Sequence, residues 1–189
     1  VVGIYISSHP LDDFTHEMEH FVSISLNCLG DLEPFLNREL SVGGIVNDVE
    51  HLESRNGKGW ARFTVEDFTD QYEFRIFGED YLKYRHFLVV NQFIRIRIMI
   101  RPGWANKETG KVGAPRMQYL SFEMLQNTLE NHAKKLTLQL DIHQLDDTKV
   151  ENLQSHLKQF KGNKSLFFCI YDSEKKIKLT LNSKKQKVQ

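Results

Sequence analysis

Residues 16–20 read HEMEH, which matches the HExxH pattern of zinc proteases. In such a site His16 and His20 would bind zinc from one sheltered side of a helix, and Glu17 would act as the base. The apolar side of the same predicted helix holds Leu11, Met18 and Val22. At about 100° per residue, the two histidines fall opposite these apolar residues. We therefore expect both histidines to face water and predict no metal site.

A second set of residues has the chemistry of nucleic-acid binding, with cations that can neutralise phosphates and aromatic rings that can stack on bases. The set consists of Arg55, Lys58 and Trp60 at a first loop, Arg62, Arg75 and Phe77 on strands, and Trp104, Lys107, Lys111 and Arg116 at a second loop. Each member also has a purely structural interpretation. Arg75, for example, could pair with Glu66 or Glu73. The combination therefore favours nucleic-acid binding more than any single residue does.

The strands that would position this set follow from alternation of apolar and polar residues, since side chains in a strand point alternately to opposite faces. The pattern predicts strands at 38–52, 60–67, 70–78, 92–101 and 116–125, with a short helix at 79–90. Gly43 and Gly44 interrupt the first strand and suggest a bend or bulge. Asn56 and Gly57 predict a tight turn after it.

Three strands, a helix and two strands, with glycines in the long first strand, is the order of an OB fold, a five-stranded partly open barrel. Such barrels bind single-stranded nucleic acid across strands 2 and 3 and the adjoining loops, where the cations and rings of this chain fall. In the fourth strand isoleucines alternate with Arg95 and Arg97. We expect the isoleucines to fill the barrel and the arginines to point away from the binding face, toward another domain.

The predicted fold class is mainly β with an α+β part, in three segments. Residues 1–37 are predicted as a helical linker to an upstream region, residues 38–125 as the OB domain, and residues 134–189 as a small β-α-β-β unit. The last unit alternates leucines in KLTLQLDI, continues with a capped helix from Asp146 to Phe160 and ends in a hairpin. Nothing in this unit resembles a catalytic constellation.

Charge is unevenly distributed although the formal net charge is zero. Residues 1–37 hold six carboxylates and no lysine or arginine, and residues 134–189 hold twelve lysines against six acids. Overall neutrality argues against a tight, purely electrostatic nucleic-acid binder.

The sequence contains no apolar run of about 18 residues, so it predicts no membrane span. Cys28 and Cys169 lack CxxC spacing, which favours a reducing, cytoplasmic location. The first residue is valine, so we expect part of a longer protein.

Two stretches carry a resemblance to a known family. VVGIYISSHPLDDF is similar to the segment ahead of the OB domain in the α subunit of bacterial DNA polymerase III, a replicative C-family polymerase. VGGIVNDVEHLESRNGKGWARFTVEDFTDQYEFRIFGEDYLKY resembles the OB domain of that family, including the FTVED strand and the IFGEDY corner. The loop at 102–115 is individual to this sequence, and Ser8 stands where the family often has glycine.

The resemblance implies an accessory C-terminal region of a DNA-directed DNA polymerase. It implies single-stranded DNA template on the OB domain, the clamp-loader τ subunit on residues 134–189, and the polymerase domains of the same chain as upstream partners. No cofactor is expected in these residues, because magnesium would serve the absent polymerase domain. Two alternatives stay open: the anticodon-binding OB domain of a class II aminoacyl-tRNA synthetase, against which the β-α-β-β unit argues, and a protein-interaction module without nucleic acid.

Overall fold

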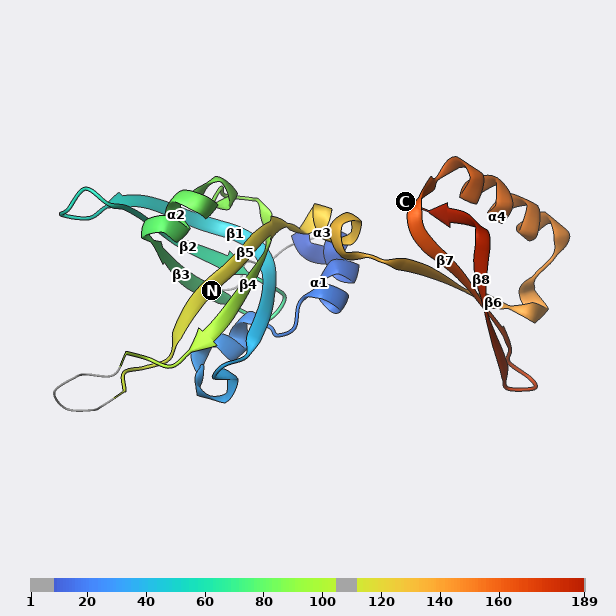
Figure 1. Cartoon of the computed structure of the whole chain (residues 1–189), viewed down its shortest axis with the longest axis horizontal. Coiled ribbons are helices and arrows are strands. Elements are labelled where there is room, and N and C mark those ends of the chain that lie inside the picture. The colour runs from blue at the N-terminus through green and yellow to red at the C-terminus, as the bar shows by residue number, and fades with distance from the viewer. Residues whose placement is uncertain (1–8, 105–111, 189) are drawn as a thin grey trace. The chain divides into compact units, whose positions relative to one another are not determined.

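The computed structural model describes residues 9–104 and 112–188, and the chain divides into two compact units between Leu129 and Glu130 (Figure 1). The strands and α-helices of the first unit are α1 (Thr15–Phe21), β1 (Glu39–Glu53), β2 (Gly59–Glu66), β3 (Gln71–Phe77), α2 (Gly78–Tyr84), β4 (Phe93–Arg101) and β5 (Arg116–Met124). Helix α3 (Leu125–His132) spans the division, and the second unit holds β6 (Lys135–Asp141), α4 (Asp147–Gln159), β7 (Lys161–Asp172) and β8 (Ile177–Val188). Short 3-10 turns lie at Pro10–Phe14, Leu26–Gly30, Glu33–Phe35, Arg85–Phe87 and Ile142–Gln144.

The first unit is built on a five-stranded antiparallel sheet in the order β3-β2-β1-β4-β5. The chain reaches β4 from β3 through α2, which is the predicted sequence of elements. Tyr119 on β5 donates a hydrogen bond from its hydroxyl to the carbonyl of Arg75 on β3 (2.9 Å), so the first and last strands of the order meet. Burial raises the pKa of Tyr119 well above its usual range, and the hydroxyl remains a donor at physiological pH.

The core of this unit lies inside the curled sheet. The predicted alternation in β4 is confirmed, because all four isoleucines from Ile94 to Ile100 are fully buried. They join buried residues from every other strand of the sheet, which include Val42, Val46, Phe63, Phe74 and Phe122. One side-chain face of each strand is thereby removed from water, and the other face is left for solvent, for a neighbouring element or for a ligand.

The N-terminal segment, predicted as a helical linker, packs in the same unit as the sheet. Leu11, Leu26 and Leu29 are at most 1% exposed. The predicted helix that contains HEMEH consists of a 3-10 turn, capped by His9, followed by the seven-residue α1. Gly43 lies beneath α1, where an added Cβ would come within 2.8 Å of Met18 Sδ.

The bulge expected at Gly43 and Gly44 lies further along β1, because the register of β1 against β2 shifts between Val46 and Asp48. The two glycines serve close packing instead. A Cβ on Gly44 would come within 2.3 Å of the Glu66 carbonyl oxygen, a distance that no side chain could occupy.

Arg95 lies on the outer face of β4, but the N-terminal segment covers it. Its guanidinium donates to the Phe21 carbonyl at the end of α1 (2.9 Å) and to Ser41 Oγ (2.7 Å), and it forms an ion pair with Glu123 on β5. Arg95 therefore fastens α1 to the sheet. Arg97 is more exposed and donates to Glu39 (2.8 Å).

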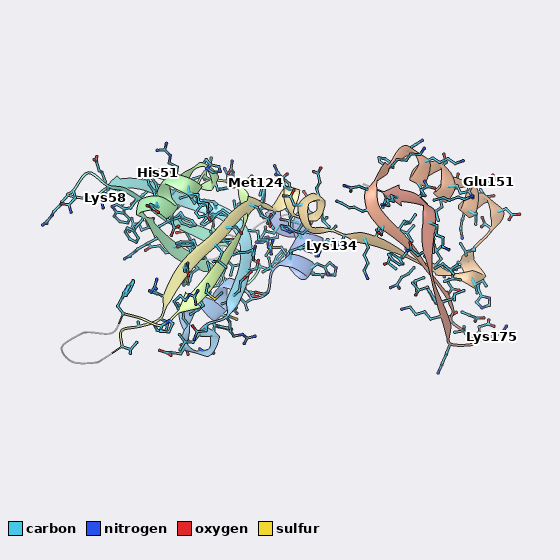
Figure 2. The ribbon with its side chains drawn as sticks, viewed as in Figure 1. His51, Lys58, Met124, Lys134, Glu151 and Lys175 are labelled. Carbon is cyan, nitrogen blue, oxygen red and sulfur yellow. The ribbon has the colours of Figure 1, made fainter. Side chains whose placement is uncertain are left out.

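The second unit has a three-stranded sheet in the order β6-β7-β8. β6 pairs with β7 in parallel, α4 makes the connection, and β7 and β8 form an antiparallel hairpin with Lys175 at its turn (Figure 2). Asp146 caps α4 by accepting the backbone N–H of Lys149 (2.7 Å). In neither unit do the described residues include a helix with the length and hydropathy that a transmembrane span requires.

Candidate nucleic-acid interface

Two aromatic side chains stack on the outer face of the five-stranded sheet. Trp60 on β2 and Phe77 on β3 are register partners, their ring centroids are 5.2 Å apart, and their planes are inclined by 18°. Trp60 is half-buried, whereas Phe77 keeps 57% of its surface exposed. Alternation along each strand puts both rings outside because Ala61 and Ile76 fill the interior. The pair offers a flat apolar surface on which a nucleic-acid base could stack.

Arg62 and Arg75 face each other directly beside these rings, and both are engaged in ion pairs. Arg62 Nη2 lies 2.7 Å from Glu50 Oε2 on β1, and its Nη1 lies 3.7 Å from Glu73 Oε2. Arg75 donates from Nε and Nη2 to the other oxygen of Glu73 (3.0 and 2.8 Å). Two cations thus share two carboxylates, and the central part of the face has no net charge.

The first loop carries cations that lack such compensation. Arg55 and Lys58 are exposed in the turn between β1 and β2, and Lys58 lies at the tip of this hairpin (Figure 2). Gly57 has a φ of 71°, as expected of the Asn-Gly turn. Among the described residues neither side chain has an ion-pair partner.

The second loop is described only at its two ends. Trp104 is 77% exposed, and the guanidinium of Arg116 lies 4.4 Å from the centre of its ring. Arg101 on β4 is the register partner of Arg116 on β5, which makes it a second described cation near this loop. The predicted contacts Lys107 and Lys111 lie outside the described residues.

Residues that complete the face were missed in the sequence. Glu50 neutralises Arg62, and Leu52, which is 37% exposed, is the register partner of Trp60. Counting outward from the Asn-Gly turn, with Glu53 opposite Gly59, would have found both pairs, because an antiparallel register continues regularly from its turn.

The two histidines of the HEMEH stretch lie on the solvent-facing side of α1. His16 and His20 are exposed, as their helical phase predicts, and their rings lie 4.3 Å apart. Glu17 is buried, so the carboxylate that would act as base lies on a different side of α1. Within residues 9–104 and 112–188, no three histidine, cysteine or acidic side chains gather closely enough to hold a metal ion.

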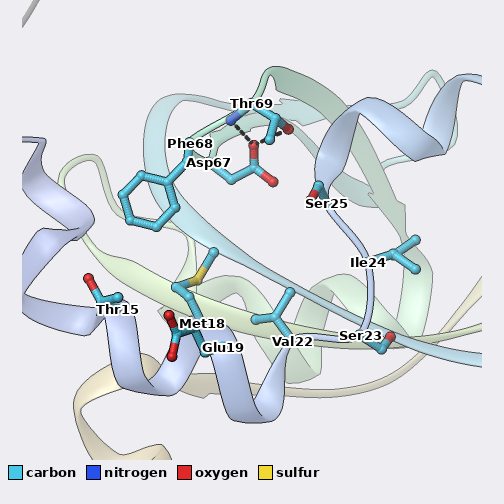
Figure 3. Close-up of a pocket in the computed structure, with 10 residues that line it drawn as sticks. All are labelled: Thr15, Met18, Glu19, Val22, Ser23, Ile24, Ser25, Asp67, Phe68 and Thr69. Atoms are coloured by element: carbon cyan, nitrogen blue, oxygen red, sulfur yellow. Dashed lines mark hydrogen bonds between the residues drawn. The ribbon is translucent and has the colours of Figure 1, made fainter.

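A pocket of about 370 Å³ lies between α1 and the turn that joins β2 to β3 (Figure 3). Met18, Val22 and Phe68 give it apolar walls, and Asp67 is its most buried acid. The Asp67 carboxylate accepts hydrogen bonds from the backbone N–H groups of Leu26, Thr69 and Asp70 and from the Thr69 hydroxyl (2.7–3.0 Å). These bonds occupy both oxygens, so Asp67 holds the turn in place and is not free to act as a general base.

One family model and several curated relatives match this chain in sequence. The family model described as "DNA polymerase III alpha subunit, C-terminal domain" matches residues 136–189. A DNA polymerase III subunit alpha from Borreliella burgdorferi is 28% identical over 186 residues, which cover 97% of this chain and 16% of the relative. The corresponding subunit from Mycobacterium tuberculosis is 30% identical over 84 residues, 44% of this chain and 7% of the relative.

The chain therefore spans about one sixth of the length of the first of these relatives. A solved structure of RecG bound to a three-way DNA junction is 15% identical, covers 51% of this chain and 12% of the RecG chain, and has a TM-score of 0.32. A TM-score this low carries no argument about fold or function.

Proposed function

Since this chain belongs to the family of DNA polymerase III α subunits, as part of their C-terminal region, we propose that it is the accessory end of a replicative DNA-directed DNA polymerase. In this proposal the five-stranded sheet is an OB barrel that binds single-stranded template, and the second unit contacts the clamp-loader τ subunit. The τ contact rests on the family resemblance of residues 134–189. The polymerase reaction itself belongs to the longer chain.

The OB assignment is supported by connectivity. The strand order β3-β2-β1-β4-β5, the helix between β3 and β4, and the Tyr119–Arg75 hydrogen bond between the outermost strands are the features of a nearly closed five-stranded barrel. In such barrels strands 2 and 3 and the adjoining loops hold the nucleic acid.

The observation that carries the proposal is the exposed Trp60–Phe77 stack on strands 2 and 3. Base stacking on aromatic rings tolerates any sequence, as a replicative template requires. Arg55 and Lys58 in the neighbouring loop are free to contact phosphates. Arg62 and Arg75 reach phosphates by exchanging their carboxylate partners for them, so we expect weak, salt-sensitive binding.

Fluorescence anisotropy with labelled single-stranded DNA, single-stranded RNA and duplex DNA tests the proposal. Three or four neutralised phosphates should give a log-log salt slope of about −2 to −3, since each contributes about −0.7. Replacing Arg62 and Arg75 together by alanine should flatten the slope by about 1 to 1.5. Arg97→Ala on the outer face of β4 is the control and should leave the slope unchanged. A stronger effect of the control would put the DNA on another face.

The ion pairs of Arg62 and Arg75 also support a second candidate, a protein-interaction module. A neutral face with exposed Leu52 and Phe77 and the half-buried Trp60 has the aromatic composition of a protein interface. If the chain binds none of the three nucleic acids, the interaction module becomes the better account. A preference for RNA would instead favour the anticodon-binding alternative.

A further inference from the structure

The three-stranded sheet of the second unit has two chemically different faces. Alternate residues along each strand point to the same side and form an aliphatic face, which includes Leu138, Leu140, Phe168, Ile170, Leu179 and Leu181. The residues between them point to the opposite side and form what we call the polar–aromatic face, which includes Lys135, Gln139, Phe167, Tyr171, Lys178 and Asn182. The aromatic residues are both on the central strand β7, with the buried Cys169 between them, and the polar residues flank them on β6 and β8.

The burial pattern of β6 and α4 indicates that the helix lies over the aliphatic face. On β6, Leu138 and Leu140 are half-buried, whereas Gln139 between them is exposed. Leu153 and Leu157 are the half-buried residues of α4, and the rest of the helix is exposed. The edge strand β6 is shielded from water only on its leucine side, and α4 has an apolar stripe. The helix must therefore lie against the leucine side of β6. The polar–aromatic face is therefore the side that α4 leaves open, and on β8 the aliphatic face is open as well, since Leu179 and Leu181 are 55% and 45% exposed.

Each aromatic ring of this face has a lysine beside it. Lys135 Nζ lies 5.8 Å from the centre of the Phe167 ring. Lys178 is exposed and is the register partner of Tyr171. The face also contains Asp141, whose carboxylate accepts hydrogen bonds from the His143 backbone N–H (3.0 Å) and the Ser173 hydroxyl (3.4 Å).

The charge of the whole unit has the same sign as that of the lysines. Residues 134–189 contain twelve lysines and six acidic residues, a formal charge of +6, whereas the complete chain is neutral. A polyanion is thus attracted to the second unit and not to the molecule as a whole. An acidic surface without rings would satisfy the lysines but leave Phe167 and Tyr171 without partners.

We propose that the polar–aromatic face is a second binding site for single-stranded DNA. Phe167 and Tyr171 stack on bases, while Lys135 and Lys178 contact phosphates on either side of them. The amides of Gln139 and Asn182, both exposed, reach base edges. A sheet with rings on its central strand and cations at its margins is the arrangement by which proteins hold unpaired nucleic acid. A strand held here would be bound independently of the barrel.

The test uses the full chain and a labelled oligothymidylate of about 20 nucleotides, long enough to span a site of this size. A barrel-face variant that combines Arg62→Ala, Arg75→Ala and Phe77→Ala removes the site proposed on the first unit. In that background, Lys135→Ala with Lys178→Ala should reduce the salt slope by about 1.4, the contribution of two phosphates. Tyr171→Leu, which keeps apolar bulk, should raise Kd about tenfold.

The matched control is Lys158→Ala with Lys175→Ala. It removes the same charge from α4 and from the β7–β8 turn, and it should change Kd less than about twofold. Equal effects of the two lysine pairs would overturn the proposal, because they would show attraction to diffuse charge. The lysine variants change only exposed side chains and test the site even if Tyr171→Leu unfolds the unit. Tighter binding of oligouridylate than of oligothymidylate would overturn DNA as the ligand.

The barrel-face variant separates this site from the proposed function. Loss of all binding in that variant would overturn the site on the second unit and support the barrel. Binding unchanged from wild type would overturn the barrel face as the DNA site and support the site on β7.

Discussion

Arg62 on β2 and Glu50 on β1 form an ion pair of 2.7 Å on the outer face of the sheet, beside the stacked rings of Trp60 and Phe77. Glu73 shares its carboxylate with Arg62 and Arg75. A phosphate that approaches this face must therefore compete with carboxylates already in place. Removal of these carboxylates should therefore change the affinity of the face for DNA.

Replacing Glu50 and Glu73 together by glutamine should strengthen binding of single-stranded DNA about threefold to tenfold at low salt. The change frees both arginines and removes two charges that repel phosphate, and exposed pairs of this kind are each worth up to about 1 kcal/mol. Anisotropy titrations measure the effect. Glu19→Gln with Glu33→Gln removes equal charge elsewhere on the first unit and should have a smaller effect. Unchanged affinity in the Glu50 and Glu73 variant would place the DNA elsewhere.

Phe77→Ala should weaken binding by about 1 to 3 kcal/mol and leave the salt slope nearly unchanged, because stacking releases no counterions. Leu82→Ala on α2 is the control, since Leu82 is an exposed apolar side chain (64%) without an aromatic ring. It should bind like wild type. Anisotropy titrations at several salt concentrations separate the stacking contribution from the electrostatic contribution to binding. A large change of the salt slope in Phe77→Ala would contradict a stacking role.

Arg95→Ala should lower the free energy of unfolding by roughly 2 to 3 kcal/mol, since it removes hydrogen bonds from a charged donor and leaves Glu123 without its arginine. The Arg95 side chain is only 11% exposed. Arg97→Ala breaks a surface pair whose members are 37% and 44% exposed and should cost less than about 1 kcal/mol. Chemical denaturation of the two variants compares these values, and equal losses would show that Arg95 does not fasten α1.

His143 and Asp172 should make the stability of the second unit depend on pH. The hydrogen bond to Asp172 (3.0 Å) raises the pKa of His143 above its ordinary value. The backbone N–H of Lys175 and then His143 lower the pKa of Asp172. A raised histidine pKa stabilises the fold below about pH 6.5, and this contribution is lost as pH rises through the folded pKa. A lowered aspartate pKa stabilises above about pH 4 and is lost as pH falls through the folded pKa.

Both contributions are therefore present together between about pH 4 and 6.5. NMR titration of the His143 ring should show the raised pKa, and Asp172→Asn should return it toward its ordinary value. His156→Gln on α4 is the control and should leave the His143 titration unchanged. An unaltered titration in Asp172→Asn would show that the two side chains do not interact in solution.

Deleting residues 134–189 should leave the first unit folded, because β1 to β5 pair only with one another among the described strands. Thermal denaturation of residues 1–133 should show one cooperative transition. A chain that is unfolded at room temperature would place the boundary between the units elsewhere.

Features that depend on strand alternation could be predicted from sequence. Burial of Ile94 and Ile96 requires only that one face of β4 meets the core, whatever lies on the other face. The surroundings of Arg95 could not be predicted this way, because its acceptor is the carbonyl of Phe21, 74 residues earlier in the chain. Local periodicity shows that an arginine points outward but not what covers it.

The sequence predicts which residues lie on the candidate site, but not which of their charges are neutralised. Trp60 and Phe77 fall on the outer face by parity, and the structure adds that they stack. The charge of Arg62 and Arg75 counts in the sequence as available to phosphate, yet each has a carboxylate within 3 Å. The pairing of Arg75 with Glu73, two residues earlier on the same strand, was one of the structural alternatives that the sequence allowed. The neutralisation of Arg62 by Glu50 depends on the register between β1 and β2, which is set by the turn and not by either residue.

The hydrogen bond from Tyr119 to the Arg75 carbonyl also bears on aggregation. Outermost strands present unpaired backbone groups that can recruit a strand from another chain. Here one such carbonyl on β3 is already occupied by a side chain from β5. Tyr119→Phe keeps the ring but releases that carbonyl, which leaves the margin of the sheet open to a foreign strand. We therefore expect the Tyr119 hydroxyl to disfavour β-sheet association between copies of this chain.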